Sequence, residues 1–270
     1  MQPMVNIALR AARLAGEQIA RAVERLDLIK SEQQGVAEFL NETCVQAERT
    51  MVHTIQKAYP SHTIVGEYSG EHAPLQEGPT FTWNINPIDS ITNFANGLPV
   101  FAISMSGHST SKIEHAIVLN PMAGEEFTCS RGYGAHFNGK RLRVSNRKTI
   151  QGSLIGTGFI GRTSDKLYLN EFQEMFRNII LADGKTFNGG SPALNLAYTA
   201  AGRLDGFFQI GLQQNEIEAG MLLLQEAGGL VGDFTGGTGY RTSGNLVAGN
   251  PKMFKALLQS IRPTLNESLK

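Results

Sequence analysis

Apolar residues recur every three or four positions near the start of the chain. They share one helical face, formed by Val5, Ala8, Ala12, Ala15 and Ile19. This spacing predicts an amphipathic helix over residues 4–23. A similar stripe, formed by Val45, Met51, Val52, Ile55 and Ala58, predicts a second helix that Pro60 ends.

From residue 62 to about 158 the pattern changes to short β-prone runs separated by turn residues. These runs predict strands at 63–65, 101–105, 115–119 and 126–129. The dipeptide Asn138-Gly139 predicts a tight hairpin. The segment 69–80, rich in glycine and proline, is expected to be a mobile loop.

After residue 160 helical spacing returns and alternates with short strands. Helices are predicted at 166–181, 191–202, 217–228 and 251–261, and strands at 206–210, 229–234 and 246–248. This order predicts a layered α/β fold. We expect an N-terminal lobe, residues 1–150, with two helices and a mostly antiparallel sheet. A C-terminal α/β lobe, residues 151–270, completes one compact unit.

Charge and cysteine usage narrow the class of protein. Lys plus Arg and Asp plus Glu each number 24, so the net charge is zero, which excludes a surface that is basic throughout for nucleic acid or anionic lipid. Cys44 and Cys129 form no C-x-x-C pair, which favours a reduced, cytoplasmic setting. The longest apolar run, 99–105, is too short to span a bilayer, and the N-terminus lacks a signal-peptide pattern. The expectation is a soluble protein without a membrane partner.

Two glycine motifs are better explained by structure than by nucleotide binding. The segment 156–161 fits G-x-G-x-x-G, but the next residues, 162–165, look like a loop rather than the helix that a dinucleotide site requires. The segment 134–140 fits G-x-x-x-x-G-K, but Arg141 stands where the magnesium-binding hydroxyl would be.

Three segments place a carboxylate at the end of a strand or in the first turn of a helix. They carry Glu67, Asp89 and Glu216. Carboxylates from separate elements can converge on a hard cation. Acids at helix starts are also ordinary caps and dipole partners, so the residues alone leave both interpretations open.

The order of several motifs resembles the inositol monophosphatase family, and more closely its bacterial SuhB-type branch. The similarity runs from end to end. It covers residues 1–8, Pro87-x-Asp89, 127–132, Glu226-Ala227-Gly228-Gly229 and 247–251. The resemblance implies a layered αβαβα sandwich, a homodimer, and magnesium-dependent hydrolysis of inositol or sugar phosphate monoesters. Clustered Mg²⁺ ions suit this reaction because they activate a water and stabilise the leaving alkoxide.

The resemblance also assigns roles to individual residues. It places metal ligands at Glu67, Asn86, Ile88 (through its carbonyl), Asp89 and Glu216. It places catalytic groups at Glu67 and Thr92, and substrate contacts at Ser90, Gly190, Ser191, Gln209 and Glu216.

Several of these positions depart from the family pattern. The family has acids at 44, 68 and 86, where this chain has Cys44, Tyr68 and Asn86, and a water-activating threonine where it has Ile91. The remaining changes are Ser90 for glycine, Asn215-Glu216 for Trp-Asp, Pro192 in the substrate loop, Gln209 for glutamate, and Phe187-Asn188 for the paired arginines of the SuhB-type branch.

The charge at four family ligand positions falls from −4 to −3, carried here by Glu67, Asp89 and Glu216 beside neutral Asn86. An amide nitrogen has no lone pair with which to bridge two cations. We therefore expect weak Mg²⁺ binding and weak or absent turnover.

Two functions remain from this resemblance. The first is a slow Mg²⁺-dependent phosphatase that acts on an inositol or sugar phosphate. The second is an inactive SuhB-type binding protein, because such relatives are regulators that act with RNA polymerase and antitermination factors on ribosomal RNA operons. A third interpretation keeps Asp89 and Glu216 only as acids at helix starts.

Overall fold

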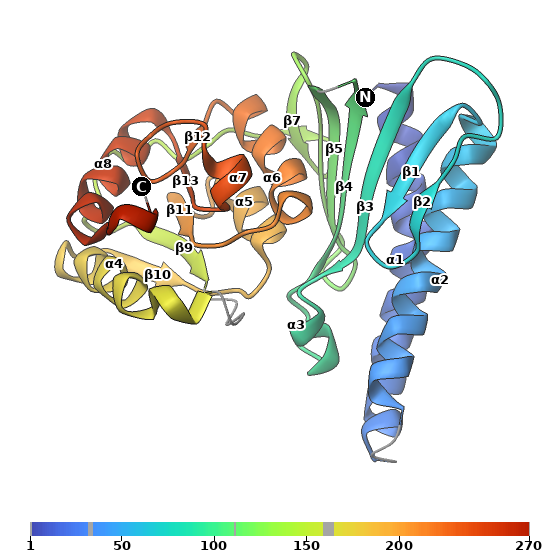
Figure 1. The fold of residues 1–270 in the computed structure, drawn as a ribbon, viewed down its shortest axis with the longest axis horizontal. Coiled ribbons are helices and arrows are strands. Elements are labelled where there is room, and N and C mark those ends of the chain that lie inside the picture. Colours follow the sequence, from blue (N-terminus) through green and yellow to red (C-terminus); the bar gives the residue numbers. More distant parts are fainter. Residues whose placement is uncertain (1, 32–34, 111, 159–164, 270) are drawn as a thin grey trace. The chain divides into compact units, whose positions relative to one another are not determined.

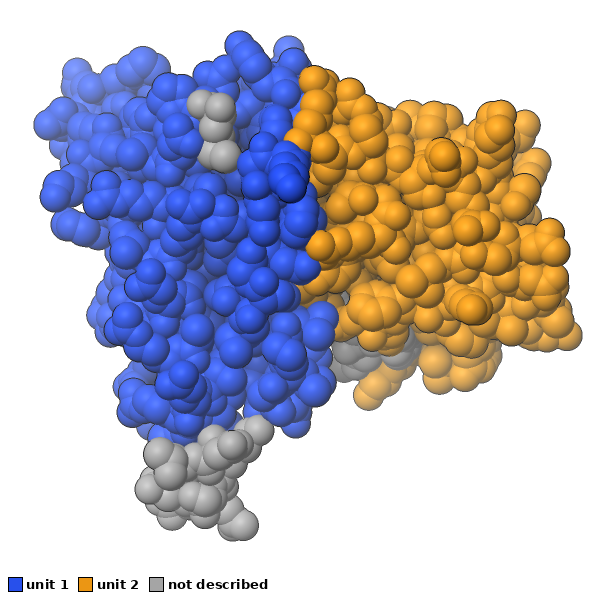
Figure 2. Space-filling model, turned by 180° about the vertical axis from the view of Figure 1, so that it is seen from behind, with its two compact units in different colours: residues 1–140 blue, residues 141–270 orange. Residues whose placement is uncertain are grey.

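The computed structural model describes residues 2–31, 35–110, 112–158 and 165–269. The chain divides into two compact units, unit 1 from Met1 to Lys140 and unit 2 from Arg141 to Lys270, coloured separately in Figure 2. Each unit combines helices with a sheet, which confirms the predicted α/β class. The predicted lobes, 1–150 and 151–270, remain a prediction.

Two long helices cover one face of the sheet of unit 1 (Figure 1). They are α1 (Pro3–Ser31) and α2 (Val36–Ala58), and they pack along each other. Both exceed the predicted bounds. In α1 the apolar face continues through Ala22 and Leu26, which are buried. In α2 the partly buried Phe39 extends the contact with the core towards the N-terminus.

The sheet of unit 1 has the strand order β2-β1-β3-β4-β5-β6-β7-β8. Its strands are β1 (His62–Gly66), β2 (Gly70–His72), β3 (Phe81–Asp89), β4 (Ala102–Ser109), β5 (Lys112–Asn120), β6 (Glu125–Ser130), β7 (Gly134–Phe137) and β8 (Lys140–Arg141). All described pairings are antiparallel except β1 with β3. Strand β2 lies inside the predicted loop 69–80, so that prediction is wrong for 70–72.

The hairpin between β7 and β8 confirms the prediction from Asn138-Gly139. Both residues have positive φ, 46° and 79°, as a tight mirror-image turn requires. No helix follows this turn, because the chain enters β8 directly. The glycines of segment 134–140 therefore belong to a hairpin, as the sequence indicated.

An aromatic cluster lies on β1 and β3 and on the residues just before β1. His62 stacks on Tyr59, with ring centroids 4.7 Å apart, and its ring is tilted by 31° against that of Phe81 at a centroid distance of 4.8 Å. The indole Nε1 of Trp83 donates a hydrogen bond to His62 Nδ1 at 3.2 Å. Because His62 Nδ1 accepts this hydrogen bond, it carries no proton. Burial lowers the pKa of His62, and nearby His115 lowers it further.

This cluster predicts a loss of stability in mild acid. Because the pKa of His62 is lower in the folded protein than its value of about 6.5 in the unfolded chain, unfolding takes up a proton as the pH falls through that value. The free energy of unfolding should fall below about pH 6.5, by at most about 1.4 kcal/mol per pH unit for this histidine. Urea unfolding followed by the fluorescence of Trp83, the single tryptophan, measures it.

The control for this prediction is His62→Gln, which removes the titrating group and keeps an acceptor for Trp83. Its stability should depend less on pH than that of the unchanged protein. Parallel pH curves for the two proteins would contradict a role for His62.

Unit 2 has a five-stranded sheet of order β10-β9-β11-β13-β12. Its strands are β9 (Leu154–Gly158), β10 (Lys185–Phe187), β11 (Gly206–Gln209), β12 (Leu230–Gly232) and β13 (Leu246–Gly249), and β10, β9 and β11 run parallel. Its α-helices are α4 (Leu169–Leu181), α5 (Pro192–Ala200), α6 (Gln214–Glu226), α7 (Tyr240–Ser243) and α8 (Pro251–Ile261). The prediction for α8 is confirmed residue for residue, and β10 and α7 were not predicted.

Helices cover both faces of this second sheet. Phe208 of β11 joins a core with Met175 of α4 and Leu257 of α8. Helices α5 and α6 pack on each other, and α5 also contacts β9 and β11 (Figure 1). The glycines at 156 and 158 lie in β9, whereas residues 159–161 of the G-x-G-x-x-G segment lie outside the described part of the chain.

Both cysteines are buried and free. Across the described residues, no helix combines the length and the apolar character needed to cross a membrane.

Candidate functional site

Two parallel strands bring the first predicted segments to one end of the sheet of unit 1. In the pairing of β1 with β3, Gly66 lies opposite Ile85. The N–H of Glu67 continues the ladder and donates to the Ile85 carbonyl at 3.2 Å. Glu67 therefore lies level with Asn86, at the end of the sheet where β3 ends in Asp89.

The end of β3 is irregular, and Asn86 stabilises that irregularity. The pairing of β3 with β4 shifts register between Asn86 and Asp89. Within this bulge, Asn86 Oδ1 accepts a hydrogen bond from the Ile88 N–H at 3.1 Å. The side chain of Ile88 enters the core, and Asp89 is only 2% exposed. The amide oxygen that stands in place of a bridging carboxylate is thus already engaged by the backbone.

The next three residues start the short helix α3 (Ile91–Ala95). Ser90 precedes it with φ 80° and ψ 65°, a left-handed conformation that favours glycine, and its side chain makes no capping hydrogen bond. Ile91 packs against the core of unit 1. Thr92 is exposed. The position of the family threonine is therefore an apolar packing position here.

Replacing Ser90 with glycine should stabilise the protein. A side chain in the left-handed region costs roughly 1–2 kcal/mol, and glycine removes this cost. Part of the gain is lost because glycine has greater conformational freedom in the unfolded chain. We expect Ser90→Gly to raise the free energy of unfolding by about 0.5–1 kcal/mol. Thr92→Gly, inside the helix, should lower it by a similar amount. Equal effects of the two variants in urea unfolding would contradict strain at Ser90.

A buried carboxylate that was not predicted from the sequence stabilises the turn that begins at Glu67. Glu48 of α2 is fully buried. Its Oε1 and Oε2 accept hydrogen bonds from the N–H groups of Tyr68 and Ser69, at 2.9 and 2.7 Å. A Cβ at Gly66 would collide with this carboxylate, which explains the glycine. The sequence held one signal for this role of Glu48: it follows Cys44 by four residues, which places both on the buried face of α2.

Tyr68 and Cys44 form a neutral pair where the family pattern has two acids. The Tyr68 hydroxyl and the Cys44 thiol are within hydrogen-bonding reach. Burial raises the pKa of the Cys44 thiol to about 12 and also raises the pKa of Tyr68. Both groups therefore stay protonated at neutral pH and add no negative charge beside Glu67.

In unit 2, Gly190 and Ser191 lead into α5. Gly190 has φ 77°, and its N–H donates to Asn188 Oδ1 at 3.3 Å. The Ser191 hydroxyl caps the helix by accepting from the Leu194 N–H at 3.2 Å. Pro192 follows at the first helical position, where a missing N–H costs nothing. The proline that departs from the family pattern therefore fits the helix start.

Gln209 and Glu216 occupy different settings in unit 2. Gln209 ends β11 and is 1% exposed, and its Oε1 has no hydrogen-bond partner among the described residues. Glu216 is half-buried in the first turn of α6, where its Oε2 accepts from the Gln213 N–H at 2.7 Å. Glu216 thus forms a capping box, the structural role that the sequence left open for it.

The predicted residues fall into two groups, one in each unit. Unit 1 holds Glu67, Asn86, Ile88, Asp89, Ser90 and Thr92, and unit 2 holds Gly190, Ser191, Gln209 and Glu216. Within the described ranges, no group of three or more His, Cys, Asp or Glu side chains is placed to hold a metal ion. The donor set in unit 1 is two carboxylates and an engaged amide, which does not fit a bridged pair of Mg²⁺ ions.

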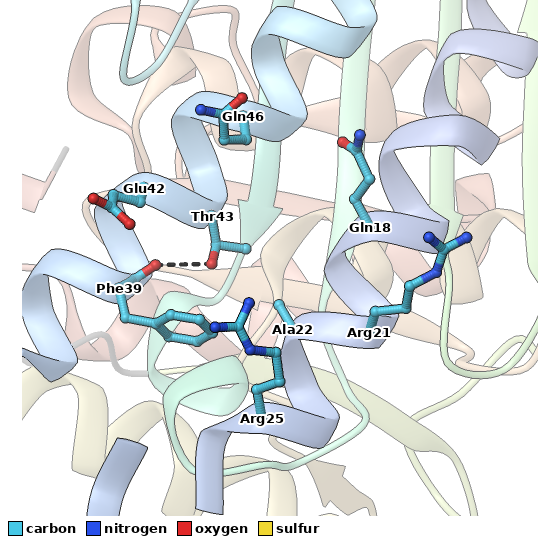
Figure 3. Close-up of a pocket in the computed structure, with 8 residues that line it drawn as sticks. All are labelled: Gln18, Arg21, Ala22, Arg25, Phe39, Glu42, Thr43 and Gln46. Carbon is cyan, nitrogen blue, oxygen red and sulfur yellow. Dashed lines mark hydrogen bonds between the residues drawn. The ribbon is translucent and has the colours of Figure 1, made fainter. Parts of the chain in front are cut away.

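A cavity of about 350 Å³ lies elsewhere in unit 1, between α1 and α2 (Figure 3). Arg21 and Arg25 line it from α1, and the Arg25 guanidinium lies 5.5 Å above the ring of Phe39 from α2. Glu42 and Thr43 also line it, and Thr43 donates to the Phe39 carbonyl. None of the predicted site residues lines this cavity.

Comparison with known proteins gives one consistent result. The model of the inositol monophosphatase family matches residues 1–267. A Pseudomonas aeruginosa protein named Nus factor SuhB is 48% identical over 270 residues, all of both chains. An Escherichia coli protein of the same name is 43% identical over 277 aligned residues, again covering all of both chains.

Solved structures agree with this result. The SuhB extragenic suppressor protein of Bartonella henselae has a TM-score of 0.86 at 29% identity, covering 98% of this chain and 100% of its own. A Thermotoga maritima inositol monophosphatase has a TM-score of 0.81 at 25% identity, covering 99% and 100%.

Proposed function

Because this chain belongs to the inositol monophosphatase family, we propose that it acts as a SuhB-type Nus factor, a binding protein in transcription antitermination. The observation that carries the proposal is its similarity, along the whole of both chains, to proteins named Nus factor SuhB. The expected partners are RNA polymerase and other antitermination factors on ribosomal RNA operons. The setting is the cytoplasm, and the assembly is a homodimer.

The changed site residues support a binding role over rapid turnover. Asn86 Oδ1 is engaged by the backbone, Ile91 packs into the core, and Cys44 and Tyr68 form a neutral pair. These changes remove three carboxylates and one hydroxyl from positions that the family uses for metal and water. Each replacement is accommodated by local packing or hydrogen bonds, so the scaffold is preserved while the charge is lost.

Family members typically use Mg²⁺, and we propose that this chain binds it weakly. The residues that would hold the ion are Glu67, Asp89, the Ile88 carbonyl, Asn86 and Glu216. An amide offers one neutral oxygen where a carboxylate offers two charged ones. Mg²⁺ also requires near-octahedral geometry, so these donors do not replace the family set.

A second candidate is slow hydrolysis of an inositol or sugar phosphate. The observation that favours it is the turn that carries Glu67, which Glu48 fixes through two backbone hydrogen bonds. Glu67 is exposed at the end of β1, where it would orient a water, and Thr92 would assist it. Substrate contacts would come from Ser90, Gly190, Ser191, Gln209 and Glu216.

Binding to purified partners tests the main proposal. The immobilised chain should retain purified RNA polymerase and antitermination factors assembled on a ribosomal RNA leader transcript. A leader with its antitermination signals scrambled is the matched control. Retention that is equal for both transcripts, or equal to bare resin, would remove the proposal. Phosphate release from inositol-1-phosphate at millimolar Mg²⁺ tests the second candidate, and a rate like that of an intact relative would show an active enzyme.

A further inference from the structure

One stretch of this electrically neutral chain carries cations and no acids. Residues 127–164 contain no Asp or Glu, although Lys plus Arg and Asp plus Glu each number 24 in the whole chain. The cations of this stretch are densest over residues 140–148, which read Lys-Arg-Leu-Arg-Val-Ser-Asn-Arg-Lys. Runs of Lys and Arg of this length are typical of surfaces that bind a polyanion. Residues 141–148 of this basic run belong to unit 2.

Unit 2 fixes the basic run through its backbone. The Val144 N–H donates to the Ala227 carbonyl at 3.3 Å. Asn250 Nδ2 donates to the carbonyls of Ser145 and Arg147, at 2.9 and 2.7 Å. The run lies in no helix, and carbonyls two residues apart that point to one side are typical of an extended chain. A surface that is already ordered loses little conformational entropy on binding.

The exposed side of the basic run is polar. Arg143, Arg147 and Lys148 are exposed. Arg147 is anchored by an ion pair, in which its Nε lies 3.3 Å from Asp205 Oδ2. Among the described residues from 134 to 158, none is an exposed large apolar side chain. Protein interfaces usually have an apolar core, so this surface suits a polyanion better than a protein partner.

A fourth cation adjoins the basic run from the turn between α5 and β11. A Cβ on Gly202 would lie 3.1 Å from the Arg143 carbonyl oxygen, so this turn packs against the run. The next residue, Arg203, is exposed, and its guanidinium carbon lies 5.1 Å from the centroid of the Tyr198 ring. Arginines and aromatic rings are the groups on which unpaired nucleobases stack. This turn therefore favours a single strand over a duplex.

Two acids adjoin these cations. Asp205 pairs with Arg147, and Glu226 precedes the Ala227 that anchors the run. The cations therefore exceed the acids by two charges. The basic surface consists of the four cations Arg143, Arg147, Lys148 and Arg203.

We propose that the basic surface binds the phosphate backbone of a single-stranded nucleic acid. A guanidinium group can donate two hydrogen bonds to one phosphate, and three of the four cations are arginines. Cations that follow an extended chain suit a strand that runs past them. The identity of this strand as RNA rests on the proposed role in transcription antitermination, whereas its binding rests on charge and geometry.

The test measures binding of the full chain to RNA in the absence of polymerase. Fluorescence anisotropy of a labelled oligouridine of about 20 nucleotides reports binding, which should weaken steeply between about 50 and 200 mM KCl. Arg143→Gln combined with Lys148→Gln should weaken binding at least about tenfold. The slope of log affinity against log salt should fall by about 1.4, or about 0.7 for each lost phosphate contact. Arg147 is kept because it pairs with Asp205.

Arg21→Gln combined with Arg25→Gln is the matched control. It removes the same charge from α1, where both arginines are exposed. Because phosphate contacts are local, this variant should bind RNA within about twofold of the unchanged chain. Arg143→Lys keeps the charge and should keep most of the affinity, which separates lost charge from altered packing.

Three results would overturn the proposal. They are no binding of oligouridine to the unchanged chain at about 50 mM KCl, equal losses in the two double variants, and competition by polyglutamate that equals competition by unlabelled oligouridine charge for charge. The second result would mean that binding follows net charge alone. The third would mean that the basic surface takes acidic protein segments.

Failure of this proposal is distinct from failure of the proposed function. A chain that does not bind oligouridine but still retains RNA polymerase on the leader transcript would remove the basic surface alone. A chain that binds oligouridine but does not retain polymerase would remove the role as a Nus factor alone.

Discussion

Glu48→Ala is expected to lower the free energy of unfolding of unit 1 by about 3–5 kcal/mol, since hydrogen bonds to a charged group contribute about 1.5–3 kcal/mol each. The variant leaves the N–H groups of Tyr68 and Ser69 without their acceptor. It also opens a cavity beside Gly66, where the carboxylate now fills the space. Urea unfolding followed by Trp83 fluorescence reports on unit 1 directly, because this single tryptophan is buried in β3.

Two variants separate hydrogen bonding from charge and packing. Glu48→Gln keeps the shape and one acceptor oxygen, so about half of the loss should remain. Glu42→Ala removes an exposed acid from the same helix and should change stability by less than about 0.5 kcal/mol. Hydrogen exchange should show faster exchange of the amides of Tyr68 and Ser69 in Glu48→Ala. A stability loss below about 1 kcal/mol, the size of one ordinary hydrogen bond, would contradict this role of Glu48 in the turn.

Asn86→Asp should raise the affinity for Mg²⁺ at least about tenfold, or about 1.4 kcal/mol. One carboxylate oxygen can accept from the Ile88 N–H as the amide does now, so the bulge survives. The second oxygen then faces the edge that Glu67 shares. A unit charge about 4 Å from a cation contributes up to about 4 kcal/mol at an effective dielectric constant of about 20, before desolvation. Titration calorimetry of the full chain with Mg²⁺ measures the change.

The controls test whether position matters or only charge. Asn96→Asp adds the same charge at an exposed residue just beyond α3 and should leave the affinity within about twofold. Adding Ser90→Gly and Ile91→Thr to Asn86→Asp should strengthen binding further, because the loop and the hydroxyl then match the family pattern. If the unchanged chain, Asn86→Asp and the triple variant bind Mg²⁺ equally, Asn86 does not lie at a metal position.

Most elements of the fold could be predicted from sequence where local chemistry fixes them. Asn250 caps α8 with hydrogen bonds to the N–H groups of Lys252 and Met253, and Pro251 starts the helix, so its bounds follow from a few residues. Strand β3 was not among the predicted strands, because Asn84, Asn86 and Pro87 break the alternation. It forms because β1 and β4 pair with it on both sides.

The sequence by itself determined the family, the α/β class, the tight turn at Asn138-Gly139 and the carboxylates missing from the family pattern. These depend on residue identity and on spacing along the chain. Only the tertiary structure decided how those changes are accommodated. Glu48 meets its hydrogen-bond donors about twenty residues further on. Asn195 of α5 and Gln209 of β11 are both buried, and their side-chain oxygens have no hydrogen-bond partner among the described residues. Hydrogen bonding and burial depend on which atoms fill the surrounding space, and the folded chain alone fixes that.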